Sequence, residues 1–183
     1  MKKRGAMEMS VGTIVTIVLL MSVLVLGLIM VRSIFMGGTT SVTKINDKVS
    51  SQIDELFASD ENLRVAIYPS DYKIKLKQGT RGEGFAFSIS NKNLESAKFK
   101  YEVGVNQYFD MEENCNINSK IADSWILQPE GEILLGGSTD MTNPKLILFN
   151  IPENAPRCTI PFKLEITEGG DPYEEVEVFL TIV

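Results

Sequence analysis

Acidic side chains gather at two places in the sequence, and carboxylates grouped in this way could bind a cation or cleave a glycosidic bond. One group is Asp110, Glu112 and Glu113, and the other is Glu168, Asp171, Glu174 and Glu175. Carboxylate oxygens on glycine-rich loops suit Ca²⁺, and two carboxylates that face each other across a cleft can hydrolyse a glycoside. Neither group has EF-hand spacing, and nothing in the sequence sets the two across a cleft. We therefore interpret both as solvated acidic turns and predict no metal site.

The chain contains no histidine. Histidine is the commonest general base with a pKa near neutrality and the commonest metal ligand. Its absence excludes a Ser-His-Asp triad, a Cys-His pair and a histidine-based zinc site. The sequence also lacks a nucleophile or phosphate-binding motif. We therefore expect a protein that is not an enzyme and that needs no cofactor.

Two cysteines, Cys115 and Cys158, are the remaining groups with distinctive chemistry. Two thiolates are too few for a four-thiolate metal site, so one disulfide is the simplest pairing, with two buried free thiols as the alternative. A disulfide would fit an oxidising exterior. It would close a loop of about 44 residues, which is worth roughly 4 kcal/mol in the chain-entropy account.

Charge is distributed unevenly along the 183 residues, whose net charge is −6. Residues 1–36 hold Lys2, Lys3, Arg4 and Arg32 against the single acid Glu8, so this part carries +3 and the remainder carries −9. A domain with that charge repels phosphate, and we expect no nucleic-acid partner.

The segment Val11–Val31 contains 21 residues without a charge. At a rise of 1.5 Å per residue, a helix of this length spans about 31 Å, the thickness of the hydrocarbon core of a bilayer. It is apolar all round, which is typical of a helix in lipid or inside a bundle. No A-x-A cleavage site follows it, so we expect it to be retained as a transmembrane helix. Small residues at Gly12, Thr16 and Gly27 could let other helices approach, although such residues are common in any membrane helix.

The basic residues at positions 2, 3 and 4 stand directly before this span and favour a cytoplasmic N-terminus. A raw count is a tie, because Arg32, Lys44 and Lys48 follow the span. The compact basic group and the possible disulfide both favour an extracellular C-terminal domain.

The opening MKKRGAMEMSV, followed directly by the apolar segment, resembles the class III signal sequence of archaeal type IV pilins and archaellins. The resemblance implies that a prepilin-type peptidase cuts between Gly5 and Ala6, and that the helix stays on the mature subunit and packs into a filament core. Bacterial type IV pilins carry Glu at the fifth mature position, where this chain has Ser10. Glu8 could instead neutralise the N-terminal amine of a neighbouring subunit, or it could be a solvated acid favoured by the helix dipole.

Gly37-Gly38 marks a hinge or helix break between the apolar segment and a second helical pattern. From Ser41 to Phe57 the apolar residues recur at helical spacing, at Val42, Ile45, Val49, Ile53, Leu56 and Phe57. This stripe could pack on the following domain, on neighbouring copies or on both; a plain juxtamembrane spacer is the alternative.

Alternating apolar residues and turn signals replace the helical pattern after residue 62. The strands we expect are Leu63–Tyr68, Tyr72–Lys77, Phe85–Ser90, Phe99–Val105, Leu146–Ile151, Thr159–Thr167 and Glu174–Val183. Gly79, Gly82 and Gly84 predict a turn, and Lys73, Lys75 and Lys77 predict the solvent face of a strand, where on an edge they would block unwanted pairing. The segment Asp110–Gly137 is interpreted as an irregular excursion in which Trp125 fills the core or, less favoured, stacks on a ligand.

About seven strands indicate an antiparallel β-sandwich, and Gly84–Val105 resembles immunoglobulin-like modules of archaeal surface proteins. The fold class is thus α+β, a long N-terminal transmembrane helix followed by an immunoglobulin-like sandwich. The predicted parts are a leader (1–5), a transmembrane or filament-core helix (6–36), a Gly hinge with an amphipathic helix (37–61) and an extracellular β-sandwich (62–183).

The sequence therefore predicts a membrane-anchored, pilin-like structural subunit of an archaeal surface filament, in adhesion or assembly. Its expected partners are membrane lipid, a prepilin-type peptidase and further copies of itself. The alternative is a monomeric single-pass cell-surface module that binds a protein or glycan. Adhesion, DNA uptake, motility and cell contact all remain open as roles for a filament.

Overall fold

The computed structural model describes residues 11–183, and within its first helix it describes the side chains of residues 12–28 and those from 48 onward. The chain divides into two compact units, Met1–Ile45 and Asn46–Val183. The predicted cleavage site Gly5-Ala6 and the predicted assembly residue Glu8 lie outside the described residues.

The first element is a long helix, α1 (Val11–Ser59). Of the two possibilities left open at Gly37-Gly38, the structure has the continued helix, since α1 includes both glycines. Glycine accepts helical dihedral angles at a cost of about 1 kcal/mol relative to alanine, so a pair of glycines weakens a helix without forbidding it. Among the residues whose side chains are described, no helix is both long enough and apolar enough to cross a membrane.

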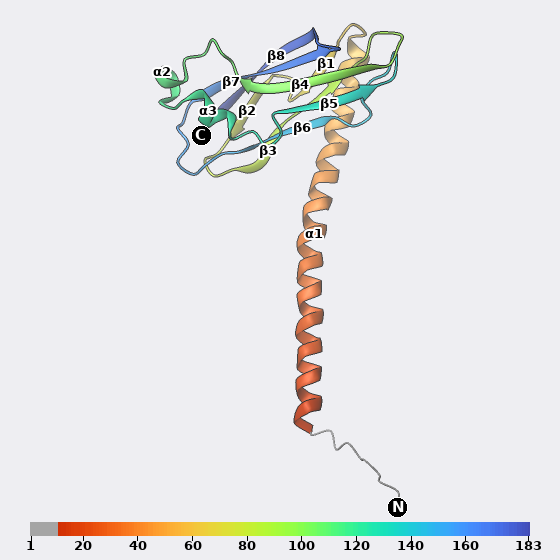
Figure 1. Cartoon of the computed structure of the whole chain (residues 1–183), viewed down its shortest axis with the longest axis vertical. Coiled ribbons are helices and arrows are strands. Elements are labelled where there is room, and N and C mark those ends of the chain that lie inside the picture. The colour runs from red at the N-terminus through yellow and green to blue at the C-terminus, as the bar shows by residue number, and fades with distance from the viewer. Residues whose placement is uncertain (1–10) are drawn as a thin grey trace, which may run out of the picture. The chain divides into compact units, whose positions relative to one another are not determined.

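Two sheets form the C-terminal domain, as Figure 1 shows. The smaller sheet has the order β1 (Val65–Tyr68), β3 (Arg81–Ile89), β6 (Lys145–Asn150). The larger has the order β2 (Lys73–Leu76), β8 (Asp171–Ile182), β7 (Thr159–Glu168), β4 (Ala97–Val105), β5 (Glu130–Leu135). Neighbouring strands are antiparallel except β2 and β8, which are parallel. A long helix followed by a β-sandwich is confirmed.

The core lies between the sheets and is built from the alternating apolar residues that the sequence indicates. Phe85, Phe87 and Ile89 of β3 are at most 1% exposed, and Phe99 and Tyr101 of β4 face them from the other sheet. The rings of Phe87 and Tyr101 meet edge to face with centroids 5.1 Å apart. Such pairs add directional stacking to the gain from apolar burial, so the two sheets are held in one register.

The last turns of α1 pack on the outer face of the smaller sheet. Val49, Ile53 and Phe57 are buried against Ala66 of β1 and Ala86 of β3. These alanines alternate with core residues along their strands, so they point away from the sandwich interior. Their small side chains let the helix approach the sheet closely. The predicted apolar stripe thus packs on the β domain; its members Val42 and Ile45 lie outside the described side chains.

Several sequence predictions for the loops are wrong. Gly79 does lie in a turn, in which the Thr80 N–H donates to the main-chain oxygen of Lys77 at 3.1 Å, but Gly82 and Gly84 belong to β3. The excursion Asp110–Gly137 contains two short helices, α2 (Met111–Cys115) and α3 (Ser119–Asp123), and the whole of β5. Position 84 requires glycine because β3 and β6 approach each other closely there. A Cβ atom at this position would stand 1.9 Å from the main-chain oxygen of Ile147 on β6. The predicted solvent-facing strand face is confirmed for Lys73 and Lys75, which are exposed on β2, and Lys77 is exposed directly after the strand. β2 borders the larger sheet, so these lysines do stand on an edge.

Candidate functional site

The first candidate site is the apolar surface of α1 between residues 12 and 28. Its large apolar side chains are between 46% (Ile17) and 69% (Leu20) exposed, on every side of the helix. Contiguous apolar surface of this extent is rare on soluble monomers and marks contact with lipid or with another protein. The described part of α1 therefore offers an interaction surface.

The hydroxyl groups within this surface are satisfied inside the helix itself. Thr16 donates its Oγ1 hydrogen to the main-chain oxygen of Thr13 at 2.9 Å, and Ser22 donates its Oγ hydrogen to that of Val18 at 2.8 Å. An unpaired hydroxyl is costly in an apolar medium, whereas these two can enter one without losing a hydrogen bond. The surface is therefore compatible with complete removal from water.

The predicted assembly residues in this part fall on one side of the helix. At 3.6 residues per turn, Gly12, Thr16 and Gly27 lie within an arc of about 60°. All three are exposed, and no atom stands within 4 Å of the place a Cβ would occupy at Gly27. Ser22 lies outside this arc and lines a shallow groove of about 450 Å³ with Val18, Met21, Val25 and Leu26. Two faces of α1 thus contain small side chains, which allow a neighbouring helix to pack closely.

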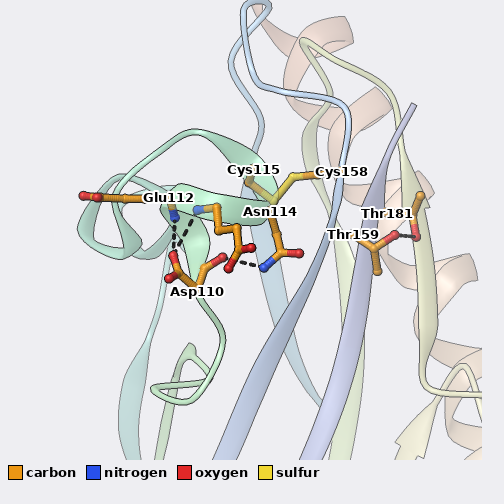
Figure 2. Close-up of a disulfide and its surroundings, with 8 residues drawn as sticks. Asp110, Glu112, Asn114, Cys115, Cys158, Thr159 and Thr181 are labelled. Atoms are coloured by element: carbon orange, nitrogen blue, oxygen red, sulfur yellow. Dashed lines mark hydrogen bonds between the residues drawn. A yellow bond between two sulfur atoms is a disulfide. The ribbon is translucent and has the colours of Figure 1, made fainter.

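The second candidate site is the end of the sandwich that carries α2 and α3 (Figure 1). A disulfide joins Cys115, the last residue of α2, to Cys158, which directly precedes β7, with a Cα–Cα distance of 5.7 Å. The pairing predicted from the sequence is therefore confirmed. Figure 2 shows the bond beside the Thr159 and Thr181 hydroxyls, which lie 2.9 Å apart.

The first acidic group lies beside α2, the helix that the disulfide joins to Cys158, and Asp110 is the N-cap residue of that helix. Its Oδ1 accepts hydrogen bonds from the main-chain N–H groups of Glu112 at 3.1 Å and Glu113 at 3.0 Å, and Asn114 donates its Nδ2 hydrogen to the main-chain oxygen of Asp110 at 2.8 Å (Figure 2). Among the described residues no three histidine, cysteine or acidic side chains are grouped closely enough to hold a metal ion.

The two acidic groups stand at opposite ends of the sandwich. Glu168 ends β7, whereas Thr159 begins it next to the disulfide that holds the Asp110 segment. Ten residues of strand span about 33 Å, while glycosidase carboxylates stand about 5–10 Å apart. These two groups therefore cannot act as one pair. Trp125 is 5% exposed and belongs to the core, as its predicted packing role requires.

A row of glutamates crosses the outer face of the larger sheet, and sequence reasoning missed it. Glu130 stands opposite Glu102, Glu102 opposite Glu165, and Glu165 opposite Glu175, so four strands each contribute one carboxylate. Only the strand register brings these residues together. Lys163 pairs with Glu165 and, at 3.5 Å, with Glu175; the hydrogen bond to Glu165 raises the pKa of the Lys163 ammonium above its ordinary value.

Comparisons with known proteins give a likeness of fold only. No protein-family model matches the chain, and no curated protein does. Solved structures that match include WR4, an MSP family member from C. elegans, with 11% identity and a TM-score of 0.37 over 66% of this chain and 98% of that one.

Two chaperones also match with the same low similarity. The E. coli chaperone DraB is 8% identical with a TM-score of 0.36 over 64% of this chain, and the periplasmic chaperone SfaE is 11% identical with a TM-score of 0.36 over 64%. The match spans 53% of DraB and 55% of SfaE, about half of each. TM-scores below 0.5 support no functional argument.

Proposed function

We propose that this chain is a membrane-anchored structural subunit of an archaeal surface filament, with a non-catalytic, immunoglobulin-like β-sandwich head outside the cell. The observation that carries the proposal is the apolar surface of α1, exposed on all sides between Gly12 and Leu28. A helix of this kind needs lipid before assembly and neighbouring helices after it.

The sequence around that surface supports a membrane location. The uncharged stretch runs from Val11 to Val31, and Lys2, Lys3 and Arg4 precede it. In the proposed pathway the N-terminus is cytoplasmic, a prepilin-type peptidase cuts between Gly5 and Ala6, and the helix then moves from lipid into the filament core. Glu8 would lie near the new N-terminal amine.

The head supports an external location. The Cys115–Cys158 disulfide persists best under oxidising conditions. The acidic surface, −9 over residues 37–183, keeps the domain soluble and away from anionic lipid headgroups. Val49, Ile53 and Phe57 of α1 are buried against the head. This part of the helix therefore packs on the domain and does not act as a plain juxtamembrane spacer.

Alkaline carbonate extraction of cells that express the full chain tests the anchor. We expect the protein to stay with the membrane pellet, and Leu20→Asp to move it toward the supernatant, since a central carboxylate opposes insertion by about 2.5–3.5 kcal/mol. Leu20→Ala is the matched control and should stay in the pellet. Release of the unaltered chain by carbonate would contradict the proposal.

Assembly separates this proposal from the alternative, a monomeric surface module on the same anchor. Gly27→Leu fills the low point of one helix face without adding charge. We expect this variant to remain in the membrane pellet but to form no surface fibres in electron micrographs. Fibres absent from the unaltered protein as well would favour the monomeric module.

A further inference from the structure

A hollow lies beside the loop between β4 and α2, at the disulfide end of the sandwich. Its volume is about 400 Å³, within the range of about 300–1,000 Å³ usual for small-molecule sites. Tyr108 lines it and is 87% exposed, more than any other aromatic side chain that the structure describes. Gln107, Asp110, Asn118 and Ser119 supply polar groups around the same hollow.

The exposed ring stands on a backbone that is held in place. The Tyr108 N–H donates to Oδ1 of Asn106 at 2.9 Å, and the Asn106 N–H donates to the main-chain oxygen of Pro161 at 2.9 Å. The Asn106 side chain also donates to Glu177 on β8. On the other side, Oδ1 of Asp123 accepts from the Val105 N–H at 2.7 Å. A large ring presented on a fixed loop loses little conformational entropy when a ligand covers it.

The ring and its surroundings match the surface of a carbohydrate. One face of a pyranose ring presents C–H groups that stack on an aromatic ring, while its edge carries hydroxyls that donate and accept hydrogen bonds. The amide of Gln107 can do both, and the free oxygen of Asp110 accepts. Asn118 contributes its Nδ2 donor, since its Oδ1 already accepts from the Lys120 N–H at 2.9 Å. The carboxylates of Asp110 and Glu112, which line the hollow, repel an acidic sugar. We propose that this hollow binds a neutral carbohydrate, with Tyr108 as the stacking platform.

A second hollow extends the site along the outer face of the larger sheet. It measures about 150 Å³ and shares Gln107 with the first. Its floor is Gly104, which faces outward because Val103 and Val105 on either side contact the core. Gly104 stands opposite Lys163 of β7, and Oδ1 of Asp123 lies 3.5 Å from the place that a Cβ would occupy there, so only a small hollow remains in an otherwise charged face. The ligand is therefore an oligosaccharide that crosses Gln107, not a single sugar.

The site is remote from the part of the head that α1 covers. Nζ of Lys92, in the loop before β4, lies 5.9 Å from the centroid of the Phe57 ring of α1. The Tyr108 loop follows the opposite end of β4. Nine residues of strand separate these ends by about 30 Å. Saccharide binding thus goes beyond the structural role proposed above and does not depend on filament assembly.

Saturation-transfer NMR and calorimetry on the full chain test the proposal. The chain is held in a detergent without a sugar headgroup and titrated with neutral mono- to tetrasaccharides of glucose, galactose, mannose and N-acetylglucosamine, and with glucuronic and galacturonic acids. We expect a neutral oligosaccharide to bind, and Tyr108→Ala to weaken it about tenfold. Tyr108→Phe, which keeps the ring, and Tyr72→Ala, which removes another exposed tyrosine, should leave the affinity nearly unchanged.

Gly104→Val tests the second hollow separately. This variant should bind a tetrasaccharide no better than a monosaccharide, while its monosaccharide affinity is kept. The proposal is overturned if no neutral saccharide binds at millimolar concentration, if the acidic sugars bind better, or if Tyr108→Ala binds as well as the unaltered chain. Carbonate extraction and electron microscopy report on the anchor and the filament independently of these results.

Discussion

Tyr173 of β8 donates its hydroxyl hydrogen to the main-chain oxygen of Ser90, 2.5 Å away, and so ties the larger sheet to the end of β3 in the smaller one. The centroids of the Tyr173 and Phe99 rings are 4.9 Å apart in an edge-to-face arrangement, and Cζ of Arg64 lies over the Tyr173 ring, 5.1 Å from its centroid. Burial raises the pKa of Tyr173 above its ordinary value. One side chain therefore links packing, sheet closure and pH dependence.

Replacement of this tyrosine by phenylalanine should destabilise the head by about 1–3 kcal/mol, because it leaves the buried Ser90 oxygen without its donor. Urea unfolding followed by Trp125 fluorescence measures the change, since Trp125 is the only tryptophan and is buried. Tyr108→Phe, at an exposed site, is the control and should shift the unfolding free energy by less than about 0.5 kcal/mol. Equal effects of the two substitutions would show that the hydrogen bond contributes nothing.

Alkaline pH should destabilise the head, starting above about pH 10. A tyrosine whose folded-state pKa is raised stabilises the fold fully below the unfolded pKa, and this contribution is lost as the pH rises toward the folded pKa. The raised pKa of Lys163 acts in the same direction. Urea midpoints measured between pH 8 and 11 should fall, and Tyr173→Phe should make that fall shallower. A fall that is equally steep in the variant would assign it to other groups.

Loss of the disulfide should lower the unfolding free energy by about 4 kcal/mol, for closure of a loop of about 44 residues. A Cys115→Ser/Cys158→Ser double variant, compared with the unaltered chain by urea unfolding, gives the value. Reduction of the unaltered chain should produce a similar loss. Rapid alkylation of both cysteines in the native, unreduced protein would contradict the bond itself.

Ile53→Ala should cost about 2–5 kcal/mol, because Ile53 is 1% exposed where α1 meets the small sheet. Leu94→Ala removes the same kind of surface from a side chain that is 92% exposed and should change stability little. Thermal unfolding of the two variants side by side makes the comparison. Similar small losses would mean that α1 does not rest on the head.

Glu102→Lys should stabilise the head by no more than about 0.5 kcal/mol at low salt. The substitution places a cation between Glu130 and Glu165 in the glutamate row, but it also removes the ion pair that Glu102 makes with Lys100 at 3.8 Å. Glu61→Lys makes the same change of net charge at an exposed loop position and serves as the control. The gain should shrink in 1 M salt, where the Debye length is about 3 Å. A gain shared by both variants would trace it to net charge alone.

The elements with strong local patterns could be predicted from the sequence. The alternation at Phe85, Phe87 and Ile89 fixes both the strand and its buried face, and the helical spacing at Val49, Ile53 and Phe57 fixes the face of α1 that packs on the sheet. In each case the residues that decide the structure are neighbours in the sequence, and their periodicity records which side is removed from water.

The elements that depend on distant partners could not be predicted. β5 begins Glu130-Gly131-Glu132, a sequence typical of a polar turn. The strand requires glycine at position 131 because the Tyr101 ring occupies the space of a side chain there. The Tyr101 hydroxyl oxygen would lie 2.6 Å from a Cβ atom at this position. Gly84 is explained only by the approach of β6. The glutamate row likewise arises from strand register, which no local pattern contains.

The proposed filament role requires that the five residues before Ala6 are removed and that the apolar helix stays on the mature chain. Mass spectrometry of the N-terminus, on full chain extracted from the membranes of a host that has a prepilin-type peptidase, measures both at once. The account predicts a mature chain that begins at Ala6 and retains α1, with the leader kept when Gly5→Val blocks the cut. An unaltered protein that still begins at Met1, or one that begins beyond Val31, would contradict it.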